Sequence, residues 1–293
     1  MTVQQILMLT LVRGTTYAII ASGLALIYGV GRIVNLAHTA FMMLSAYLIS
    51  QLAVGYGWPL TAAVAVAVVG TGVLGLLFYR FVLNRVREHQ AAVLLITIAV
   101  AMGIQQLMPI LFGSLPAPVP LILEGAVPVF GFPVPKQYLL TLGISLGFLG
   151  LLWLLLSRTK IGIGIRAVAQ DTEVANLMGI NVSTILMIAM GIGTTMAAVA
   201  GALVPAVEGG SVSQYFWLFT LLMVLVVVIL GGLGSLKGSF IAAFFVAFVQ
   251  ALVSTLFPHQ AYLSYAFAMV AMVVMLSVRP QGMFGTLFEE ERL

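Results

Sequence analysis

One stretch decides the fold class: residues 91–112 read AAVLLITIAVAMGIQQLMPILF, 22 residues in a row without Lys, Arg, Asp or Glu. At about 1.5 Å per residue, a helix of this length matches the roughly 30 Å hydrocarbon core of a bilayer. Its polar side chains are limited to Thr97 and the neighbouring glutamines Gln105 and Gln106. The stretch therefore predicts a membrane-spanning helix.

The composition of the whole chain agrees with this stretch. Of its 293 residues, 62% are hydrophobic and only 7% are charged, whereas about 25% of residues are charged in soluble domains. This balance excludes a soluble enzyme, a nucleic-acid-binding protein and a disordered chain. The apolar runs are continuous and do not alternate with polar residues, which favours membrane helices over a barrel. The absence of cysteine excludes disulfides, thiolate metal sites and cysteine nucleophiles.

Similar apolar segments recur along the chain, and they predict an all-α integral membrane protein. We expect a polytopic helical bundle of about nine spans, folded as a single domain over residues 1–293. The first span contains Arg13 and can begin nearer Ile6, because a long basic side chain can reach the interface. The predicted spans are residues 15–30, 34–54, 60–79, 91–112, 138–156, 184–207, 216–230, 239–257 and 262–278.

The basic residues predict the orientation, because Lys and Arg collect in cytoplasmic loops. If the loop 79–90, which holds three arginines, is cytoplasmic, then nine alternating spans place ten of the 12 Lys and Arg residues inside. Only Arg13 and Lys136 fall outside. The N-terminus is then outside and the C-terminus cytoplasmic. The first 12 residues carry no charge and no cleavage pattern, so we expect no removable signal peptide.

Two loops are too long to be simple turns. The outer loop 113–137 contains six prolines and cannot be helical throughout, so we expect an extended lid on the outer face. The inner loop 157–183 carries five charged residues, and within it residues 171–178 predict a short helix. Asp171 is a suitable N-cap and Gly179 a suitable stop. A polar helix on this face predicts a docking element for a soluble partner; the alternative is an ordinary solvated loop.

Small residues predict where backbones approach closely. Gly143 with Gly147, and Ala197 with Gly201, stand four residues apart within predicted spans, as in closely packed membrane helices. A second pattern is the glycine-rich segment between the seventh and eighth spans, which predicts a break between two helices. Its glycines, candidates for a hinge or gate, are Gly231, Gly232 and Gly234.

The chain contains no recognisable nucleotide or catalytic site. The pattern Gly-x-Gly-x-x-Ala at 162–167 follows a membrane helix, not a strand, and the segment 231–239 fails as a phosphate loop because Leu236 and Gly238 flank Lys237. We therefore expect no ATP site, metal or cofactor in this chain. The chain lacks the paired carboxylates or nucleophile that an intramembrane enzyme would need. It also lacks an ionisable residue in mid-span, which argues against proton-driven transport. A secondary carrier stays an alternative function, because neutral oxygens can form a sodium site.

Four stretches carry motifs in the order found in one known family. They are GLALIYG at 23–29 followed by NLAH at 35–38, the inner-loop pattern over 157–181, LGGLGS at 230–235 with Gly238, and RPQG at 279–282. Together they resemble the branched-chain amino acid ABC transporter permeases of the LivH type, over nearly the whole chain. Two positions depart from the family: Thr39 stands where a glycine is usual, and the apolar run 41–44 replaces an acidic residue.

The resemblance implies a type II-like permease domain, a multi-pass subunit of an ABC importer in the bacterial inner membrane. Its implied partners are a second related permease, two cytoplasmic ABC ATPases that use ATP and Mg²⁺, and a periplasmic solute-binding protein. Ala175 would offer little bulk on a helix inserted into an ATPase groove. The residues implied to couple the permease to the ATPases, all in the loop 157–183, are Arg166, Asp171, Glu173, Ala175 and Gly179.

The substrate path is expected to combine neutral polar and apolar side chains, which suits leucine, isoleucine or valine. Aromatic amino acids, short amides and urea are alternative solutes. We expect Asn35 and His38 to share a helix face near the cytoplasmic end of the second span and to border an inner gate. Helix–helix hydrogen bonding is the alternative role for each candidate. The candidates for the path are Asn35, His38, Gln105, Gln106, Thr194 and Thr195.

Overall fold

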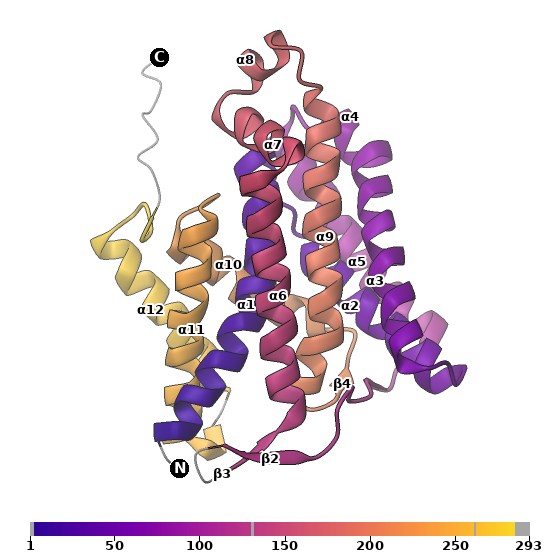
Figure 1. Ribbon diagram of the computed structural model, residues 1–293, viewed down its shortest axis with the longest axis vertical. Helices are drawn as coiled ribbons and strands as arrows, with labels where there is room; N and C mark the ends of the chain where they lie inside the picture. Colours follow the sequence, from indigo (N-terminus) through magenta and orange to yellow (C-terminus); the bar gives the residue numbers. More distant parts are fainter. Residues whose placement is uncertain (1–2, 130–131, 261, 285–293) are drawn as a thin grey trace.

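The computed structural model describes residues 3–129, 132–260 and 262–284, which form a bundle of long helices with short strands at one end (Figure 1). Six helical segments in this part of the chain are long and apolar enough to cross a membrane. They are α1 (Val3–Gly31), Leu60–Val86, α5 (Gln90–Phe112), α6 (Lys136–Arg158), α9 (Val182–Val207) and α11 (Leu236–Leu256). The segment Leu60–Val86 consists of α3 (Leu60–Phe78), a π-helical turn (Tyr79–Leu83) and α4 (Asn84–Val86).

Three shorter helices complete the bundle and coincide with the remaining predicted spans. They are α2 (His38–Ser50), which continues into a π-helical turn (Gln51–Gly55), α10 (Phe216–Gly231) and α12 (Leu263–Val278). At about 1.5 Å per residue, α10 and α12 with 16 residues each are about 24 Å long. These two helices are therefore shorter than the hydrocarbon core is thick. In the described part of the chain, the number of apolar helical segments, nine, agrees with the prediction.

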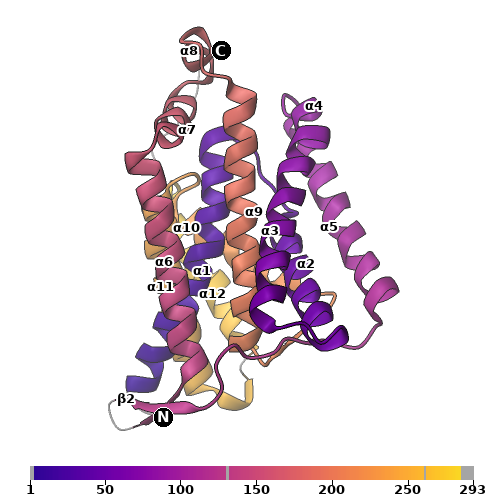
Figure 2. The same ribbon diagram turned by 45° about the vertical axis from the view of Figure 1, so that its right-hand side comes forward.

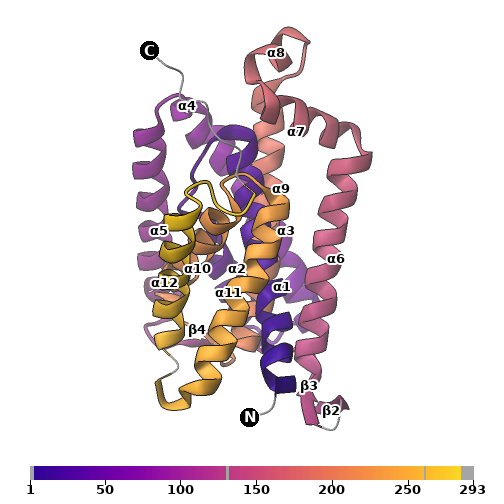
Figure 3. The same ribbon diagram turned by 90° about the vertical axis from the view of Figure 1, so that its left-hand side faces the viewer.

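The two ends of the bundle differ. The helix α1 begins beside the hairpin of β2 (Ala126–Val129) and β3 (Phe132–Pro135), and we call this the hairpin end. At the opposite end, which we call the α8 end, α8 (Thr172–Leu177) lies above the other helices and α7 (Lys160–Gln170) lies just below it (Figure 2). The helix α7 runs across the bundle between the tops of α6 and α9 (Figure 3).

The core of the bundle is the crossing of α1 and α9. A Cβ atom added to Gly23 would lie 2.9 Å from the carbonyl oxygen of Gly193, and one added to Gly193 would lie 2.8 Å from that of Gly23. Only glycine permits this approach, which brings the two backbones into van der Waals contact. Farther along α9, a Cβ on Gly201 would lie 2.4 Å from the Met42 carbonyl oxygen of α2. Close packing at Ala197 and Gly201 is therefore confirmed.

The prediction of close packing at Gly143 and Gly147 was wrong for this chain. A Cβ atom added to either residue would have no other atom within 4 Å. Both lie on the exposed side of α6, a helix of which little is buried in the bundle. Small residues four positions apart indicate that another helix could pack closely there, but they do not show whether any helix of the bundle does.

The second predicted span begins too early. Residues 32–37 are not helical and enter the bundle as an extended segment, so α2 starts only at His38. Arg32 takes a positive φ of 52°, and the Asn35 side chain accepts a hydrogen bond from the Ala37 backbone N–H at 3.1 Å. An Asx turn of this kind competes with helix formation, and apolar periodicity alone does not register it.

The proline-rich outer loop is extended, as its sequence predicts. Strand β1 (Ala117–Pro118) pairs antiparallel with β4 (Ser211–Val212), which follows α9, and β2 pairs with β3. The buried Gln137 side chain accepts hydrogen bonds from the backbone N–H groups of Ile122 and Leu123 at 3.0 and 3.1 Å. The loop is thereby tied to the start of α6 and the end of α9.

The inner loop contains more helix than expected. Besides the predicted short helix, which is α8, residues Lys160–Gln170 form α7, whose N-cap Thr159 accepts a hydrogen bond from the Gly162 N–H at 3.1 Å. In α7 the residues Gly162, Ile165 and Val168 are buried, at helical spacing, against the bundle. The sequence did not predict this helix, because its two glycines lower the helix propensity of the segment.

Candidate functional site

The helix α8 has the caps that its sequence predicts. The Asp171 carboxylate accepts hydrogen bonds from the backbone N–H groups of Glu173 and Val174, both at 2.9 Å. At the other end, Gly179 has a φ of 83°, and the N–H groups of Gly179 and Ile180 donate to the carbonyl oxygens of Asn176 and Ala175 at 3.0 Å each. This is the Schellman arrangement that ends a helix.

The orientation of α8 corrects the expectation for Ala175. This residue is only 4% exposed and packs on the chain's own core, so it cannot enter a groove on a partner. Its small size instead lets α8 lie close to the bundle. The surface of α8 carries apolar side chains that the sequence pattern did not single out: Val174 is 54% exposed, Leu177 85% and Met178 78%.

A polar recess adjoins α8 at its junction with α9. It has a volume of about 490 Å³. The Ser183 hydroxyl donates to Asn84 Oδ1 at 2.8 Å, which ties the start of α9 to α4. Arg166 and Glu173 are both exposed on this end of the molecule. The recess is lined by Arg87, Thr172, Glu173, Asn176 and residues 179–183.

Asn35 and His38 lie deep inside the bundle, so their predicted position at the end of a helical span was wrong. Asn35 is in the extended segment and its amide points to Met190 Sδ of α9 at 3.6 Å. His38 is the first residue of α2, and its Nε2 lies 3.1 Å from the carbonyl oxygen of Ile20, near the middle of α1. Both side chains are fully buried. Together they mark a helix break within the bundle.

Such a break is unusual at this depth. Non-helical backbone in a membrane protein is tolerated where protein or a water-filled cavity surrounds it. Broken helices near the middle of the membrane are typical of transport sites, where exposed backbone groups become available. The imidazole Nδ1 of His38 is buried and has no hydrogen-bond partner among the described residues. At the break, one of the residues predicted to line the path, His38, therefore keeps a buried polar atom that is free to hydrogen-bond with a solute or water.

The two glutamines of α5 separate in the structure. Gln105 Oε1 accepts a hydrogen bond from Trp217 Nε1 of α10 at 2.7 Å, and the Trp217 carbonyl oxygen accepts one from the Thr39 hydroxyl at 2.9 Å. Gln105 thus joins α5 to α10 and, through Trp217, to α2. Gln106 is exposed on the outer side of α5 and lies apart from this group.

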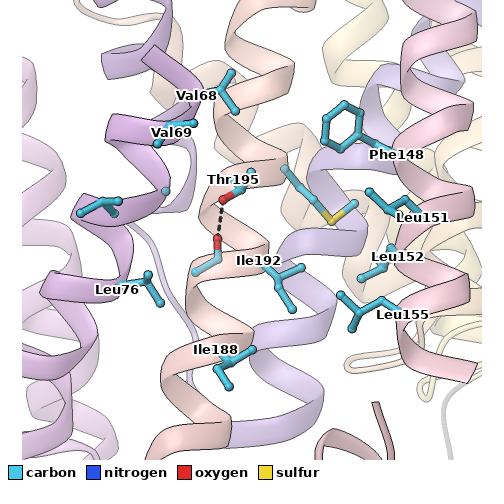
Figure 4. A pocket seen from close by; sticks show the side chains of 14 residues that line it. Val68, Val69, Leu76, Phe148, Leu151, Leu152, Leu155, Ile188, Ile192 and Thr195 are labelled. Atoms are coloured by element: carbon cyan, nitrogen blue, oxygen red, sulfur yellow. Dashed lines mark hydrogen bonds between the residues drawn. The ribbon is translucent and has the colours of Figure 1, made fainter. Parts of the chain in front are cut away.

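The two threonines of α9 bond to their own helix. The Thr194 hydroxyl donates to the Met190 carbonyl oxygen at 2.9 Å, and that of Thr195 donates to Gly191 at 2.7 Å. Thr194 faces Gly75 of α3, whereas Thr195 lines an apolar groove between α3, α9 and α6 (Figure 4). The structure therefore does not gather the six candidates into one site.

The glycine-rich turn after α10 joins three of the sequence motifs. Gly232 and Gly234 have φ values of 97° and 82°, and a Cβ on Gly234 would lie 3.1 Å from the Cα of Gly29 in α1. A Cβ on Gly282 would lie 2.7 Å from the Gly232 backbone nitrogen. Gly231 is equally confined, since its Cβ would lie 2.4 Å from the carbonyl carbon of Gly238. The predicted break between two helices is present.

A polar cluster toward the hairpin end escaped the sequence reasoning. The Tyr17 hydroxyl donates to Gln250 Oε1 at 2.8 Å, and Gln250 Nε2 donates to Met223 Sδ at 3.1 Å, which connects α1, α11 and α10. Arg13 and Glu208 lie near this cluster. Glu208 follows α9 and reaches solvent, yet the surrounding protein raises the pKa of its carboxyl, against the opposing positive charge of Arg13. The sequence did contain a signal for this cluster: Tyr17 and Gln250 are polar residues within the predicted apolar spans 15–30 and 239–257.

These features define a class of protein: a multi-pass helical membrane protein in which the non-helical connection between α1 and α2 enters the bundle, and which carries an exposed helix at one end. Residues 6–276 match the family model of the permease component of branched-chain amino acid transport systems. The chain belongs to this family.

Individual relatives agree with the family match. The chain is 27% identical over 290 residues to the high-affinity branched-chain amino acid transport system permease protein LivH of Escherichia coli K12. It is 28% identical over 287 residues to the corresponding protein BraD of Pseudomonas aeruginosa. Each alignment covers 93% of this chain and 92% of the relative.

The fold is similar to that of a solved structure, PsaBC from Streptococcus pneumoniae in complex with Fab. The TM-score is 0.51 at 14% sequence identity, and the alignment covers 94% of this chain and 92% of that chain. At this identity, the likeness concerns the fold.

Proposed function

We propose that this chain is the membrane-spanning permease subunit of an ATP-driven importer of branched-chain amino acids. The observation that carries the proposal is the family match over residues 6–276, which includes the helix break, α8 and the glycine turn. The relatives LivH and BraD are named as branched-chain amino acid permeases along the same length. The predominantly apolar interior suits a solute with an aliphatic side chain.

The partners in this proposal are a second related permease, two ABC ATPases and a periplasmic solute-binding protein. ATP and Mg²⁺ are bound by the ATPases, and this chain supplies no nucleotide site, metal or cofactor. The exposed Val174, Leu177 and Met178 of α8 support docking of an ATPase, because an apolar surface on an otherwise polar helix is typical of an interaction site. The outer loop 113–137 receives the binding protein.

The proposed orientation puts the α8 end in the cytoplasm of the bacterial cell and the hairpin end outside. The connections at the α8 end hold nine of the 11 described Lys and Arg residues, all except Arg13 and Lys136. Arg292, also assigned to the inside, lies outside the described residues. This asymmetry supports the orientation through the positive-inside rule. The N-terminus is then outside.

The proposed coupling runs through rigid elements. Movement of a docked ATPase acts on the exposed face of α8. Because both ends of α8 are held by capping hydrogen bonds, α8 moves as a rigid unit and displaces α7 and α9. Because α9 packs against Gly23 and the break before α2, displacement of α9 changes the contacts that close the centre of the bundle. Access alternates if the two arrangements differ in these contacts.

Reconstitution tests the proposal. The chain, its partner permease, the ATPases and the binding protein are placed in liposomes, and uptake of radiolabelled leucine is measured with and without ATP. We expect ATP-dependent uptake that unlabelled isoleucine and valine inhibit. Uptake by this chain alone under an ion gradient would identify a secondary carrier. Competition by phenylalanine, a short amide or urea, but not by isoleucine, would change the solute class.

A further inference from the structure

A groove between α6 and α11 is left open by the part of the chain that the structure describes. It has a volume of about 540 Å³, which lies in the range of small-molecule sites. Its walls are apolar apart from Ser22 of α1 and Lys237 of α11. We call it the α6–α11 groove. Its lining residues are Ser22, Leu146, Leu149, Gly150, Leu152, Trp153, Leu156, Leu236, Lys237, Phe240 and Ile241.

The residues around the groove confirm that it is open. A Cβ atom added to Gly150 would have nothing within 4 Å, and Trp153, one turn farther along α6, is 65% exposed. Both α6 and α11 are long and apolar enough to cross a membrane. An apolar groove between two such helices opens to the acyl chains of the bilayer, and an acyl chain fills it without removing a polar group from water.

Charge is present at only one end of the groove. Lys237 stands in the first turn of α11, where the helix dipole adds a partial positive charge. Arg158 and Lys160 lie at the same end, at the junction of α6 with α7. No acidic residue lines the groove. A basic rim above an apolar groove complements a molecule with an anionic head and an apolar tail.

We propose that the α6–α11 groove binds an anionic phospholipid of the cytoplasmic leaflet. One acyl chain lies along Leu149, Gly150 and Phe240, and the phosphate pairs with Lys237. Basic pockets between membrane helices on the cytoplasmic side recognise such head groups. The assignment to the cytoplasmic leaflet rests on the orientation given with the proposed function; the groove and its charge do not.

The bound lipid would affect transport through α6. This helix leads directly into α7 and then α8, the proposed coupling helix. A lipid wedged between α6 and α11 restrains α6 relative to the core helices. Anionic lipid then increases the fraction of ATPase-driven movement that reaches the bundle.

Native mass spectrometry of the purified full-length chain tests binding independently of any solute. The chain is exposed to phosphatidylglycerol or phosphatidylcholine, and the bound lipid is counted for Lys237→Gln and Gly150→Phe. Loss of one basic contact is expected to lower phosphatidylglycerol affinity about fivefold and to lower phosphatidylcholine affinity less, because the choline group already offsets the charge of that lipid's phosphate. Gly150→Phe is expected to remove the bound lipid, because the ring fills the groove.

Matched controls separate the groove from general effects. Lys136→Gln removes a basic residue at the hairpin end, and Gly103→Phe adds the same ring at an open position on α5, away from the groove. Both are expected to retain phosphatidylglycerol as the unsubstituted chain does. Equal retention by Lys237→Gln, Gly150→Phe and the controls would overturn the proposal. In a separate co-purification with the second permease, loss of that permease in Gly150→Phe together with unchanged lipid retention would overturn the proposal and assign the groove to a protein neighbour.

Discussion

The helix α8 and the break before α2 are both short departures from the long helices, but they are maintained in different ways. The bounds of α8 come from local contacts, an Asp171 side chain at one end and Gly179 at the other, and its outer face is exposed. At the break, Asn35 and His38 are fully buried, and their side chains contact α9, more than 150 residues away in the sequence, and the middle of α1. A local motif can therefore act on a partner without disturbing the bundle, whereas the break depends on the bundle.

The largest effect is expected from Leu177→Asp in α8. Leu177 is 85% exposed, so a carboxylate there does not disturb the fold, but it places a charge in the proposed apolar contact with the ATPase. We expect insertion and thermal stability to be unchanged, while ATPase co-purification and ATP-dependent uptake fall at least tenfold. The measurements are a pull-down and uptake in liposomes. Leu177→Met, which keeps an apolar side chain of similar volume at the same position, is the control, and normal ATPase binding by Leu177→Asp would contradict this role of α8.

The opposite behaviour is expected at Asn35. Asn35→Leu removes the acceptor for the Ala37 N–H inside the bundle, and an unsatisfied buried donor costs about 1–3 kcal/mol. We expect a lower melting temperature in detergent and reduced transport, with ATPase binding intact. Asn35→Ser keeps a hydroxyl acceptor for the turn without burying a charge, and controls for the turn. If only yield falls and uptake per molecule is unchanged, the break has a structural role and no part in the path.

A smaller effect is expected at the end of α8. Gly179→Val forces a β-branched residue into positive φ, which costs roughly 1–2 kcal/mol. Because the neighbourhood of Gly179 is open, the strain stays local to α8, and we expect weaker ATPase binding with an unchanged melting temperature. A calorimetric scan and a titration with ATPase separate the two. A large fall in melting temperature would show that α8 is not a local unit. Gly125→Val, another positive-φ glycine at the hairpin end, is the control.

The smallest effect is expected at the start of α8. Asp171→Ala removes the N-cap and costs about 1 kcal/mol, which corresponds to about a fivefold loss of ATPase affinity. Asp171→Asn keeps a capping oxygen and is expected to restore most of the affinity. If Asn and Ala behave alike, the carboxylate acts through its charge toward the partner and not as a cap. Hydrogen exchange of the Glu173 and Val174 amides measures the cap directly.

Sequence reasoning succeeded where the determining interactions are local. Continuous apolar runs predict the nine helical segments because lipid leaves the backbone no partner outside a helix. The caps of α8 were readable because Asp171 and Gly179 act within one turn of themselves. The glycine turn at 231–234 was readable for the same reason, since positive φ favours glycine.

Sequence reasoning failed where a distant neighbour decides. Apolar periodicity extended the second span to residue 34, although the Asn35 side chain and contacts with α1 and α9 hold that segment extended. The same limit applied to Ala175, whose small side chain suited either the partner or the bundle until α8 was seen against the core.

The amino-acid sequence by itself determined the membrane fold, the number of apolar segments and the local stops of α8, because these depend on hydrophobic length and on hydrogen bonds within a few residues. Tertiary structure alone decided that three separate motifs meet around Gly29, Gly232 and Gly282, that Gln105 pairs with Trp217 while Gln106 does not, and that α6 stands beside an open groove. Those outcomes depend on which helix faces become neighbours, and that information is distributed over the whole bundle.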